Sequence, residues 1–166
     1  MSAFKLKRLL KLNWLLPCLL LVLTAAGALI LTGGHPPAYY LSIYEGRSEE
    51  VITQLEVALA DQVALDYIHS SDGTPVKAIF VIEEKGLRLV EEKYSWYGSG
   101  LESGAGYEFS YQEKEVTVSG YDRVFEELPV RVARTVAQNI HINEEIIALN
   151  QLAPGGSLLI IRVETE

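Results

Sequence analysis

The sequence has almost none of the residues that form covalent cross-links. Its single cysteine, Cys18, lies in an N-terminal apolar run, so the rest of the chain contains no thiol. A disulfide or a thiolate metal site is excluded there, and stability has to come from packing. The histidines are also sparse, and His35, His69 and His141 lack the paired spacing of a zinc site. We predict no metal and no cofactor.

The N-terminal part of the chain lacks acidic residues, and much of it lacks lysine and arginine as well. No aspartate or glutamate precedes Glu45, and no basic residue lies between Leu12 and Tyr44. The four earlier bases are Lys5, Lys7, Arg8 and Lys11. Because they contribute +4 to a net charge of −8, the remainder carries −12. This balance excludes nucleic acid as a partner, since phosphate binding requires a basic patch.

An uncharged run of 19 residues, WLLPCLLLVLTAAGALILT, extends from Trp14 to Thr32. A helix of this length nearly spans a hydrocarbon core of about 30 Å. We predict a transmembrane helix over 12–32 that acts as a signal anchor. Cleavage after Ala26-Gly27-Ala28 is the alternative, but Leu29–Leu31 prolongs the apolar run beyond that site. Lipoprotein processing at Cys18 is disfavoured, because Pro17 precedes the thiol and the run continues past it.

The basic residues predict the orientation of this helix. The positive-inside rule makes 1–11 a cytoplasmic basic segment, 33–38 a linker and 39–166 an extracytoplasmic β-domain. The expected location is the cell membrane of a bacterium or archaeon, with the bilayer as partner through 12–32. Trp14, Tyr39 and Tyr40 suit the two interfacial belts.

From Tyr39 onward, short alternating segments broken by turn residues predict a mainly β fold. Val63, Leu65, Tyr67 and His69 share one strand face, and a hairpin returns through SSDGTP. The expected fold is a small antiparallel β-sandwich or barrel-like domain. Strands are predicted over Val76–Ile82, Leu87–Trp96, Tyr107–Tyr111, Glu115–Ser119, Leu128–Val136 and Leu158–Val163.

Several segments need more than a simple alternation. Residues 48–60 fit either a helix capped at Ser48 or a strand. The apolar phase changes between Leu89 and Tyr94, which indicates a bulge or a strong twist. The run SLLIIRV predicts a strand covered on both faces. Tyr107, Phe109 and Tyr111 are expected on a packed sheet face. A solvated face is expected for Glu83, Glu84, Glu91, Glu92, Glu126, Glu127, Glu144 and Glu145.

The hairpin also carries residue types found in hydrolases. His69, Ser70 and Asp72 fall within four positions, however, and neighbouring residues of a strand point to opposite faces. A catalytic triad is therefore excluded, and we predict a protein that is not an enzyme. His69 then has either a structural role, satisfied by hydrogen bonds near the turn, or a ligand role in a small polar pocket shared with YGSG. The candidate binding or interface residues are His69, Ser70, Asp72, Trp96, Tyr97, Gly98 and Gly100.

Three motifs carry a resemblance to a known family. YIHSSDGTPV at Tyr67–Val76, YSWYGSGL at Tyr94–Leu101 and LAPGGSLLIIRV at Leu152–Val163 resemble the domain-of-unknown-function family eighteen-fifty. The matching signature positions are His69, Ser70, Pro75, Val76, Tyr97, Gly98, Gly100 and Leu101. Ser99 and Glu102 depart from the usual Gly-Ala-Gly-Leu-Pro ending of that family. The resemblance implies a transporter context, because many members are encoded beside TRAP transporters of the TAXI subtype.

Topology and resemblance together predict a non-catalytic accessory or regulatory component of a TAXI-type TRAP system. Its expected contacts are the permease or the solute-binding protein. A small-ligand-binding or sensing module is the first alternative, and it predicts a defined pocket around His69 and Gly98. An envelope assembly factor is the second, and it predicts an exposed apolar patch without a pocket.

Overall fold

The computed structural model describes residues 37–69, 73–95, 106–112 and 115–165. They belong to one compact unit, Pro37–Glu166. Within these ranges, no helix has the length and apolar character needed to cross a bilayer. The segment 12–32, for which we predict a transmembrane helix, lies outside the described residues.

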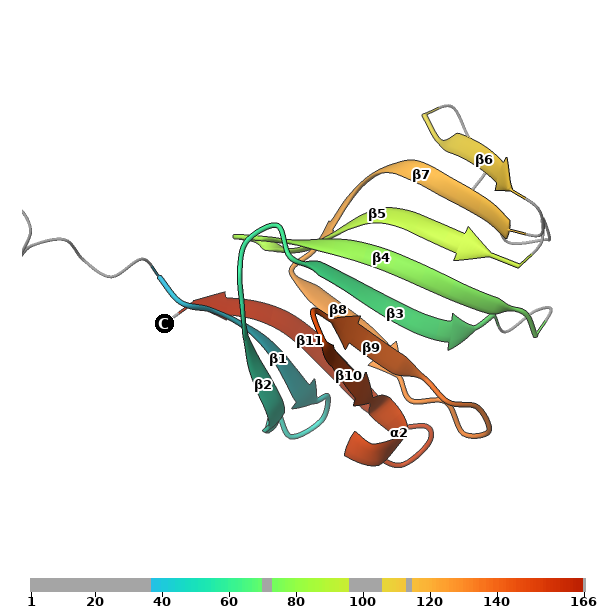
Figure 1. The fold of residues 1–166 in the computed structure, drawn as a ribbon. Helices are drawn as coiled ribbons and strands as arrows, with labels where there is room; N and C mark the ends of the chain where they lie inside the picture. The colour runs from blue at the N-terminus through green and yellow to red at the C-terminus, as the bar shows by residue number, and fades with distance from the viewer. Residues whose placement is uncertain (1–36, 70–72, 96–105, 113–114, 166) are drawn as a thin grey trace, which may run out of the picture. The chain divides into compact units, whose positions relative to one another are not determined.

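The described residues form antiparallel β-sheets, which confirms the mainly β prediction. A four-stranded sheet has the order β2-β1-β11-β8, and a seven-stranded sheet has the order β10-β9-β3-β4-β5-β7-β6 (Figure 1). The elements are β1 (Tyr39–Glu45), β2 (Val51–Val57), β3 (Gln62–Ile68), β4 (Pro75–Glu83), β5 (Gly86–Tyr94), β6 (Glu108–Gln112), β7 (Glu115–Phe125), β8 (Glu127–Arg131), β9 (Asn139–Ile142), β10 (Glu145–Ala148), α2 (Leu149–Leu152) and β11 (Leu158–Thr165).

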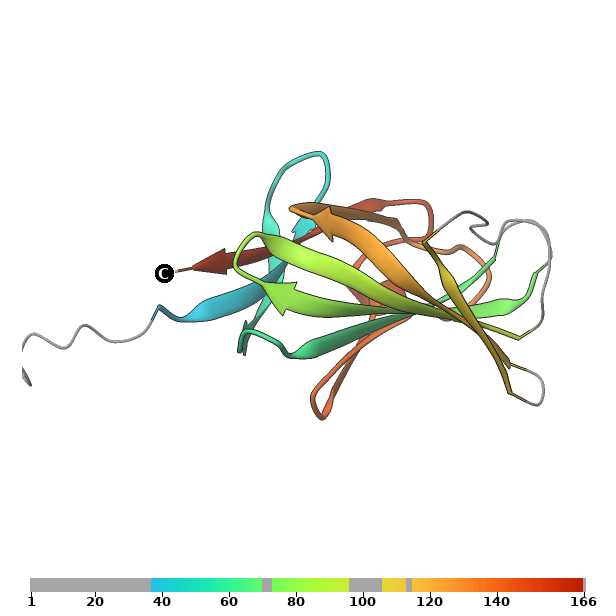
Figure 2. The same cartoon turned by 90° about the horizontal axis from the view of Figure 1, so that it is seen from above.

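The four-stranded sheet resolves the ambiguity at 48–60, because Val51–Val57 pairs with β1 as strand β2. Tyr39 of β1 pairs with Thr165 of β11, so both ends of the domain lie at one end of this sheet. Figures 1 and 2 both place the end of β11 beside the start of β1. The expectation that SLLIIRV is covered on both faces holds only in part. Leu159 and Ile161 are buried, whereas Leu158 and Ile160 on the opposite face are half-buried.

The predicted hairpin is confirmed, since β3 and β4 pair in register from Gln62↔Val81 to Ile68↔Pro75. The predicted strand Leu128–Val136 is too long, because β8 ends at Arg131. Beyond that point the amide of Ala133 donates to the Gln138 side chain, 2.9 Å away, and the chain leaves the sheet. Strands β9 and β10 and helix α2 were missed, because four-residue elements are too short to show a period.

The core lies between the sheets and has an apolar lining from both. Buried residues of the small sheet include Leu41, Ile43, Leu159 and Ile161. Those of the large sheet include Val63, Ala78, Phe80, Ile82, Leu87, Val118, Ile140 and Ile142. Strands β11 and β8 contact β5 across this layer. The core holds the described domain together without any cross-link.

A bulge in β5 changes which residues face this core. Ile79 and Phe80 of β4 pair with Glu91 and Leu89 of β5, so Val90 between them has no partner on β4. Leu89 therefore faces inward before the bulge and Tyr94 faces inward after it. The phase change between Leu89 and Tyr94 predicts a bulge or a strong twist, and the structure shows a bulge.

Candidate binding site

The bulge places the carboxylate of Glu92 on the inner face of the large sheet. Its partners across the two neighbouring strands are Ala78 of β4 and Val118 of β7, and both are buried. Without the extra residue Val90, the alternation that starts at Leu89 would place Glu91 here instead. The prediction of a solvated face is therefore wrong for Glu92.

Three tyrosine hydroxyls from three strands donate hydrogen bonds to this carboxylate. The hydroxyls of Tyr94 on β5 and Tyr121 on β7 each lie 2.7 Å from Glu92 Oε2. The hydroxyl of Tyr67 on β3 lies 3.3 Å from Oε1. Tyr94 and Tyr121 are only 7% and 8% exposed, and Glu92 provides their hydroxyls with an acceptor inside the domain. We call these four residues the Glu92–tyrosine cluster.

The pKa of each tyrosine in the cluster is raised. Burial is the main cause for Tyr67, Tyr94 and Tyr121, because it disfavours the phenolate. The neighbouring charge of Glu92 and the hydrogen bond to it raise the three pKa values further. The phenols therefore stay protonated at neutral pH and act as donors.

The cluster lines a cavity of about 730 Å³. Six of its sixteen described lining residues are aromatic rings of phenylalanine or tyrosine, namely Tyr67, Phe80, Tyr94, Tyr107, Tyr121 and Phe125. The rings of Phe80 and Phe125 meet edge to face with their centroids 5.9 Å apart. The rings of Tyr107 and Tyr121 lie 5.2 Å apart. A volume of this size is typical of small-molecule sites, which lie in the range of roughly 300 to 1,000 Å³.

Glycine backbone forms another part of the cavity wall. Gly120 lies in the segment of β7 that has no partner on β5 and has a φ of +85°. A Cβ at this position would lie 2.6 Å from the carbonyl oxygen of Gly106. Only glycine permits both this left-handed backbone and the close approach of the two segments.

Charged side chains at the cavity include both signs. Glu92, Asp122 and Arg123 line it together with His69. The Arg123 guanidinium lies over the ring of Phe125, 4.4 Å from the ring centroid. This contact is a cation–π interaction, and it illustrates that the aromatic wall accepts a positive charge.

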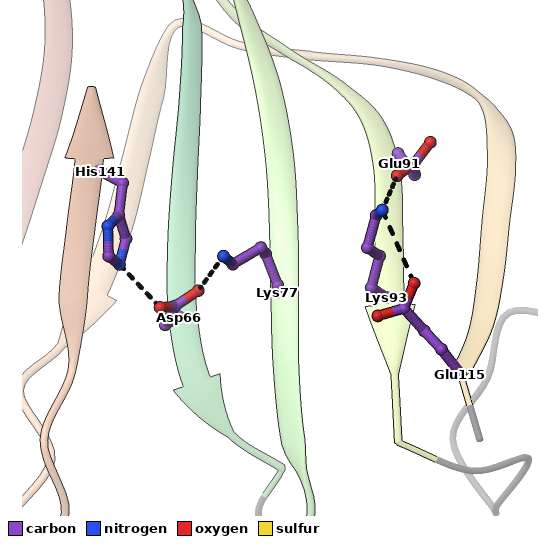
Figure 3. Close-up of polar contacts among 6 residues, drawn as sticks. All are labelled: Asp66, Lys77, Glu91, Lys93, Glu115 and His141. Carbon is purple, nitrogen blue, oxygen red and sulfur yellow. Dashed lines mark hydrogen bonds and ion pairs between the residues drawn. The ribbon is translucent and has the colours of Figure 1, made fainter. Parts of the chain in front are cut away.

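The opposite face of the large sheet carries charged contacts within and between strands, drawn in Figure 3. Asp66 of β3 lies between His141 of β9 and Lys77 of β4, at 2.7 Å and 3.5 Å respectively. Lys93 of β5 lies between Glu91 and Glu115, at 3.3 Å and 3.6 Å (Figure 3). Half-exposed pairs of this kind contribute at most about 1 kcal/mol each, so we interpret them as surface contacts that support the sheet.

A further hollow of about 810 Å³ lies at the ends of β3, β4 and β5 and includes Asp66, Lys77 and Lys93 in its lining. Its lysines are already paired with carboxylates. Among the residues that the structure describes, no group of three histidine, cysteine, aspartate or glutamate side chains could hold a metal ion.

Of the residues proposed from the sequence, His69 lines the cavity beside Leu65 and Tyr67. Its backbone closes the hairpin, since its amide donates to the carbonyl of Thr74 at 2.8 Å and its carbonyl accepts from Gly73 at 3.0 Å. Both the structural role and the ligand role fit this position. The remaining candidates, Ser70, Asp72, Trp96, Tyr97, Gly98 and Gly100, lie outside the described residues.

The aromatic strand β6 differs from the expectation at one position. Tyr107, just before the strand, and Phe109 pack against the core. Tyr111 is 64% exposed, so the prediction of a packed face is wrong for this residue. Among the described strands, β6 lies at the edge of its sheet and pairs with β7 on one side.

The fold and cavity define a two-sheet β-domain with a polar cluster inside an aromatic pocket. Over residues 63–149 the chain matches the family described as Domain of unknown function (DUF1850). The match covers more than half of the chain, which therefore belongs to this family. The resemblance seen in the sequence is confirmed, and all residues that line the cavity fall within the matched region. Searches of curated proteins and of solved structures found no match.

Proposed function

We propose that the domain is a non-catalytic module that binds a small ligand carrying a positively charged amino group. The observation that carries this proposal is the carboxylate of Glu92 inside an aromatic cavity, held by three phenols from three strands. A carboxylate provides the counter-charge for an ammonium group. Aromatic faces attract the same group through their quadrupoles.

The charge balance of the cavity supports a cationic ligand. Glu92 and Asp122 are both acidic, whereas Arg123 is the one arginine or lysine among the described lining residues. Arg123 already lies over the ring of Phe125, 4.4 Å from its centroid. An incoming cation would therefore meet a net negative lining.

The chemistry of the cluster supports binding in preference to catalysis. Because the pKa values of Tyr67, Tyr94 and Tyr121 are raised, these hydroxyls are poor bases and poor nucleophiles at neutral pH. They orient the carboxylate from three sides. A fixed acceptor in a preformed pocket is what selective binding needs.

Titration calorimetry with three probes of one shape tests this proposal on the full chain. Benzylammonium should bind, and benzyl alcohol and benzoate should bind at least about tenfold more weakly. Glu92→Gln should reduce benzylammonium affinity by roughly tenfold, because the amide keeps one acceptor oxygen for the phenols but removes the charge. Glu91→Gln, one position away on the outer face, should leave affinity unchanged. Equal affinity for the three probes, or no binding of the cation, would contradict the proposal.

We further propose that this module, as a β-sandwich outside the cytoplasm, is anchored in the cell membrane by 12–32. There it would serve as an accessory component of a TAXI-type TRAP transport system. Family membership over residues 63–149 and the uncharged run Trp14–Thr32 support this second proposal. Affinity purification of the full chain from its native membranes should recover the permease or the solute-binding protein. Recovery of neither subunit would contradict the transport role and leave the ligand proposal standing.

A further inference from the structure

Three separate segments meet at the end of the four-stranded sheet away from Tyr39. They are the turn after β1, the chain that follows β8, and the turn that precedes β11. The amide of Gly46 donates to the carbonyl of Leu158 at 2.9 Å, and the amide of Val132 donates to Ser157 at 2.9 Å. These backbone bonds hold the three segments in one arrangement.

A hollow of about 360 Å³ lies between these segments, with Arg47, Arg131 and Arg134 in its lining. Nη1 of Arg131 donates to the carbonyl oxygen of Gly156 at 2.8 Å, which fixes its guanidinium against the turn. The hydroxyl-bearing Ser157 lines the same hollow. One guanidinium therefore comes from each of three places: the turn after β1, the end of β8 and the chain beyond it.

The two glycines of the Pro154–Gly156 turn make room for Arg134. A Cβ on Gly155 would lie 2.7 Å from the Cα of Arg134. A Cβ on Gly156 would lie 3.0 Å from both Nε and Nη2 of Arg134, and the φ of Gly156 is +94°. Any larger residue would push the guanidinium away, so the glycine pair sets the position of Arg134 as well as the turn.

The positive charge of this hollow contrasts with the rest of the domain. The sequence beyond Tyr44 carries −12 and has ten lysines and arginines, the fourteen of the whole chain less the four before Leu12. Three of these ten line the one hollow. In the part of the chain that the structure describes, Arg131 and Arg134 make no ion pair.

Among the described lining residues, the one carboxylate is that of Glu45, and it accepts hydrogen bonds from its own turn. Oε2 of Glu45 accepts hydrogen bonds from the amide of Arg47 at 2.8 Å and from the amide of Ser48 at 2.7 Å. The Ser48 hydroxyl adds a third bond at 3.1 Å. The hollow therefore retains a surplus of positive charge over its single acid.

We propose that this hollow, which we call the arginine pocket, binds a phosphate-type oxyanion. Guanidinium groups match the oxygens of a phosphate through paired, charge-assisted hydrogen bonds. The group has two possible sources, a soluble phosphorylated compound and a lipid headgroup. The pocket lies at the end of β1 opposite Tyr39. Because a seven-residue strand spans roughly 20 Å, the pocket is about that far from the start of β1.

The test measures phosphate binding by the full chain and three variants, using phosphorus NMR titrations with inorganic phosphate. We expect a titratable shift for the native chain and at least a tenfold loss of affinity for Arg134→Gln. Arg134→Lys should lose less phosphate affinity, because lysine keeps the positive charge but lacks the planar guanidinium that makes paired hydrogen bonds. Arg88→Gln removes an equal charge from a residue paired with Glu83 and should leave the affinity unchanged.

A second measurement distinguishes the sources of the anion. The full chain is placed in phosphatidylcholine nanodiscs with and without phosphatidylglycerol, and the phosphate titration is repeated. Competition by phosphatidylglycerol that disappears in Arg134→Gln upholds the oxyanion site and assigns it to a headgroup. Unchanged affinity in the anionic discs upholds it and assigns it to a soluble compound. Absence of phosphate binding by the native chain, or equal affinity in Arg134→Gln, overturns the arginine pocket. None of these outcomes affects the proposal of a cation site at Glu92, which rests on other residues.

Discussion

Replacing Glu92 by alanine should lower the free energy of unfolding by roughly 2 to 6 kcal/mol. The change removes the acceptor from Tyr94 and Tyr121, which are both more than nine-tenths buried. Each buried donor left without a partner costs about 1 to 3 kcal/mol. Tyr67 lies 3.3 Å from the carboxylate and adds a smaller loss. Urea unfolding of the full chain, followed by the near-ultraviolet circular dichroism of tyrosine, measures the difference.

The matched control is Glu91→Ala on the outer face of the same strand. Glu91 is paired with the half-exposed Lys93 at 3.3 Å, so its loss should cost no more than about 1 kcal/mol. A rescue adds a sharper test. Tyr94→Phe and Tyr121→Phe combined with Glu92→Ala should recover most of the lost stability, since the two most buried donors are removed together with their acceptor and only the Tyr67 hydroxyl loses its partner. Similar losses for Glu91→Ala and Glu92→Ala would mean that the cluster does not stabilise the fold.

Alkaline conditions should unfold the domain steeply above about pH 10. The pKa values of Tyr67, Tyr94 and Tyr121 are all raised in the folded chain, first by burial and then by Glu92. The unfolded chain therefore releases these protons at lower pH than the folded chain does. Their contribution to stability is fully present below the ordinary tyrosine pKa of about 10 and is lost as the pH rises above it.

The size of the alkaline effect follows from the number of tyrosines involved. Each one costs about 1.4 kcal/mol per pH unit, so the three together cost roughly 4 kcal/mol per unit. This rivals the whole stability of a typical domain, about 5 to 15 kcal/mol, within two or three pH units. Urea midpoints collected across the alkaline range measure the slope, and phenolate absorbance reports whether ionisation coincides with unfolding.

Variants identify the groups responsible for the alkaline slope. The double variant Tyr94→Phe/Tyr121→Phe should retain only about one third of it. Tyr111→Phe removes a tyrosine that is 64% exposed and should retain all of it. Early ionisation of all tyrosines in the folded chain, well below the unfolding transition, is the result that would rule out this account.

The Glu92–tyrosine cluster places a charged group where an apolar one would pack more simply. Ala78 and Val118, its partners across the strands, are ordinary core residues. Replacing buried charges by apolar side chains is often neutral or stabilising, so stability alone does not explain an inward-facing carboxylate. Ligand recognition provides a reason for its presence. The stability tests and the benzylammonium titration therefore examine separate consequences of one arrangement.

The hairpin and the bulge illustrate what local pattern predicts well. Tyr67–Ile82 combines two alternating runs with a strong turn sequence, so its pairing depends on neighbours in the chain. The change of apolar phase between Leu89 and Tyr94 likewise indicated a bulge or a strong twist, and the register of β4 and β5 shows a bulge at Val90. A bulge here implies an inward-facing Glu92, whereas the exposure of glutamate in most proteins favours the solvated face.

Residues 48–60 and the arginine pocket depended on partners distant in the chain. Both a helix and a strand satisfy the periodicity of Val51–Val57, and pairing with β1 decided between them. Arg47 and Arg131 are separated by more than eighty positions in the sequence, and no spacing rule connects them. They meet because β1 and β8 both pair with β11.

The sequence by itself determined the mainly β class, the central hairpin, an irregularity in β5 and the family, since each depends on local alternation, turn residues or short motifs. Only the tertiary structure decided that Tyr67, Tyr94 and Tyr121 converge on Glu92 and that the arginines share one hollow. Tyr67 and Tyr121 lie 25 and 29 positions from Glu92 along the chain, and Arg47 and Arg131 belong to segments that β11 brings together. Strand order and register determine which distant side chains come together. Both depend on the packing of the whole domain, so local sequence patterns do not predict them.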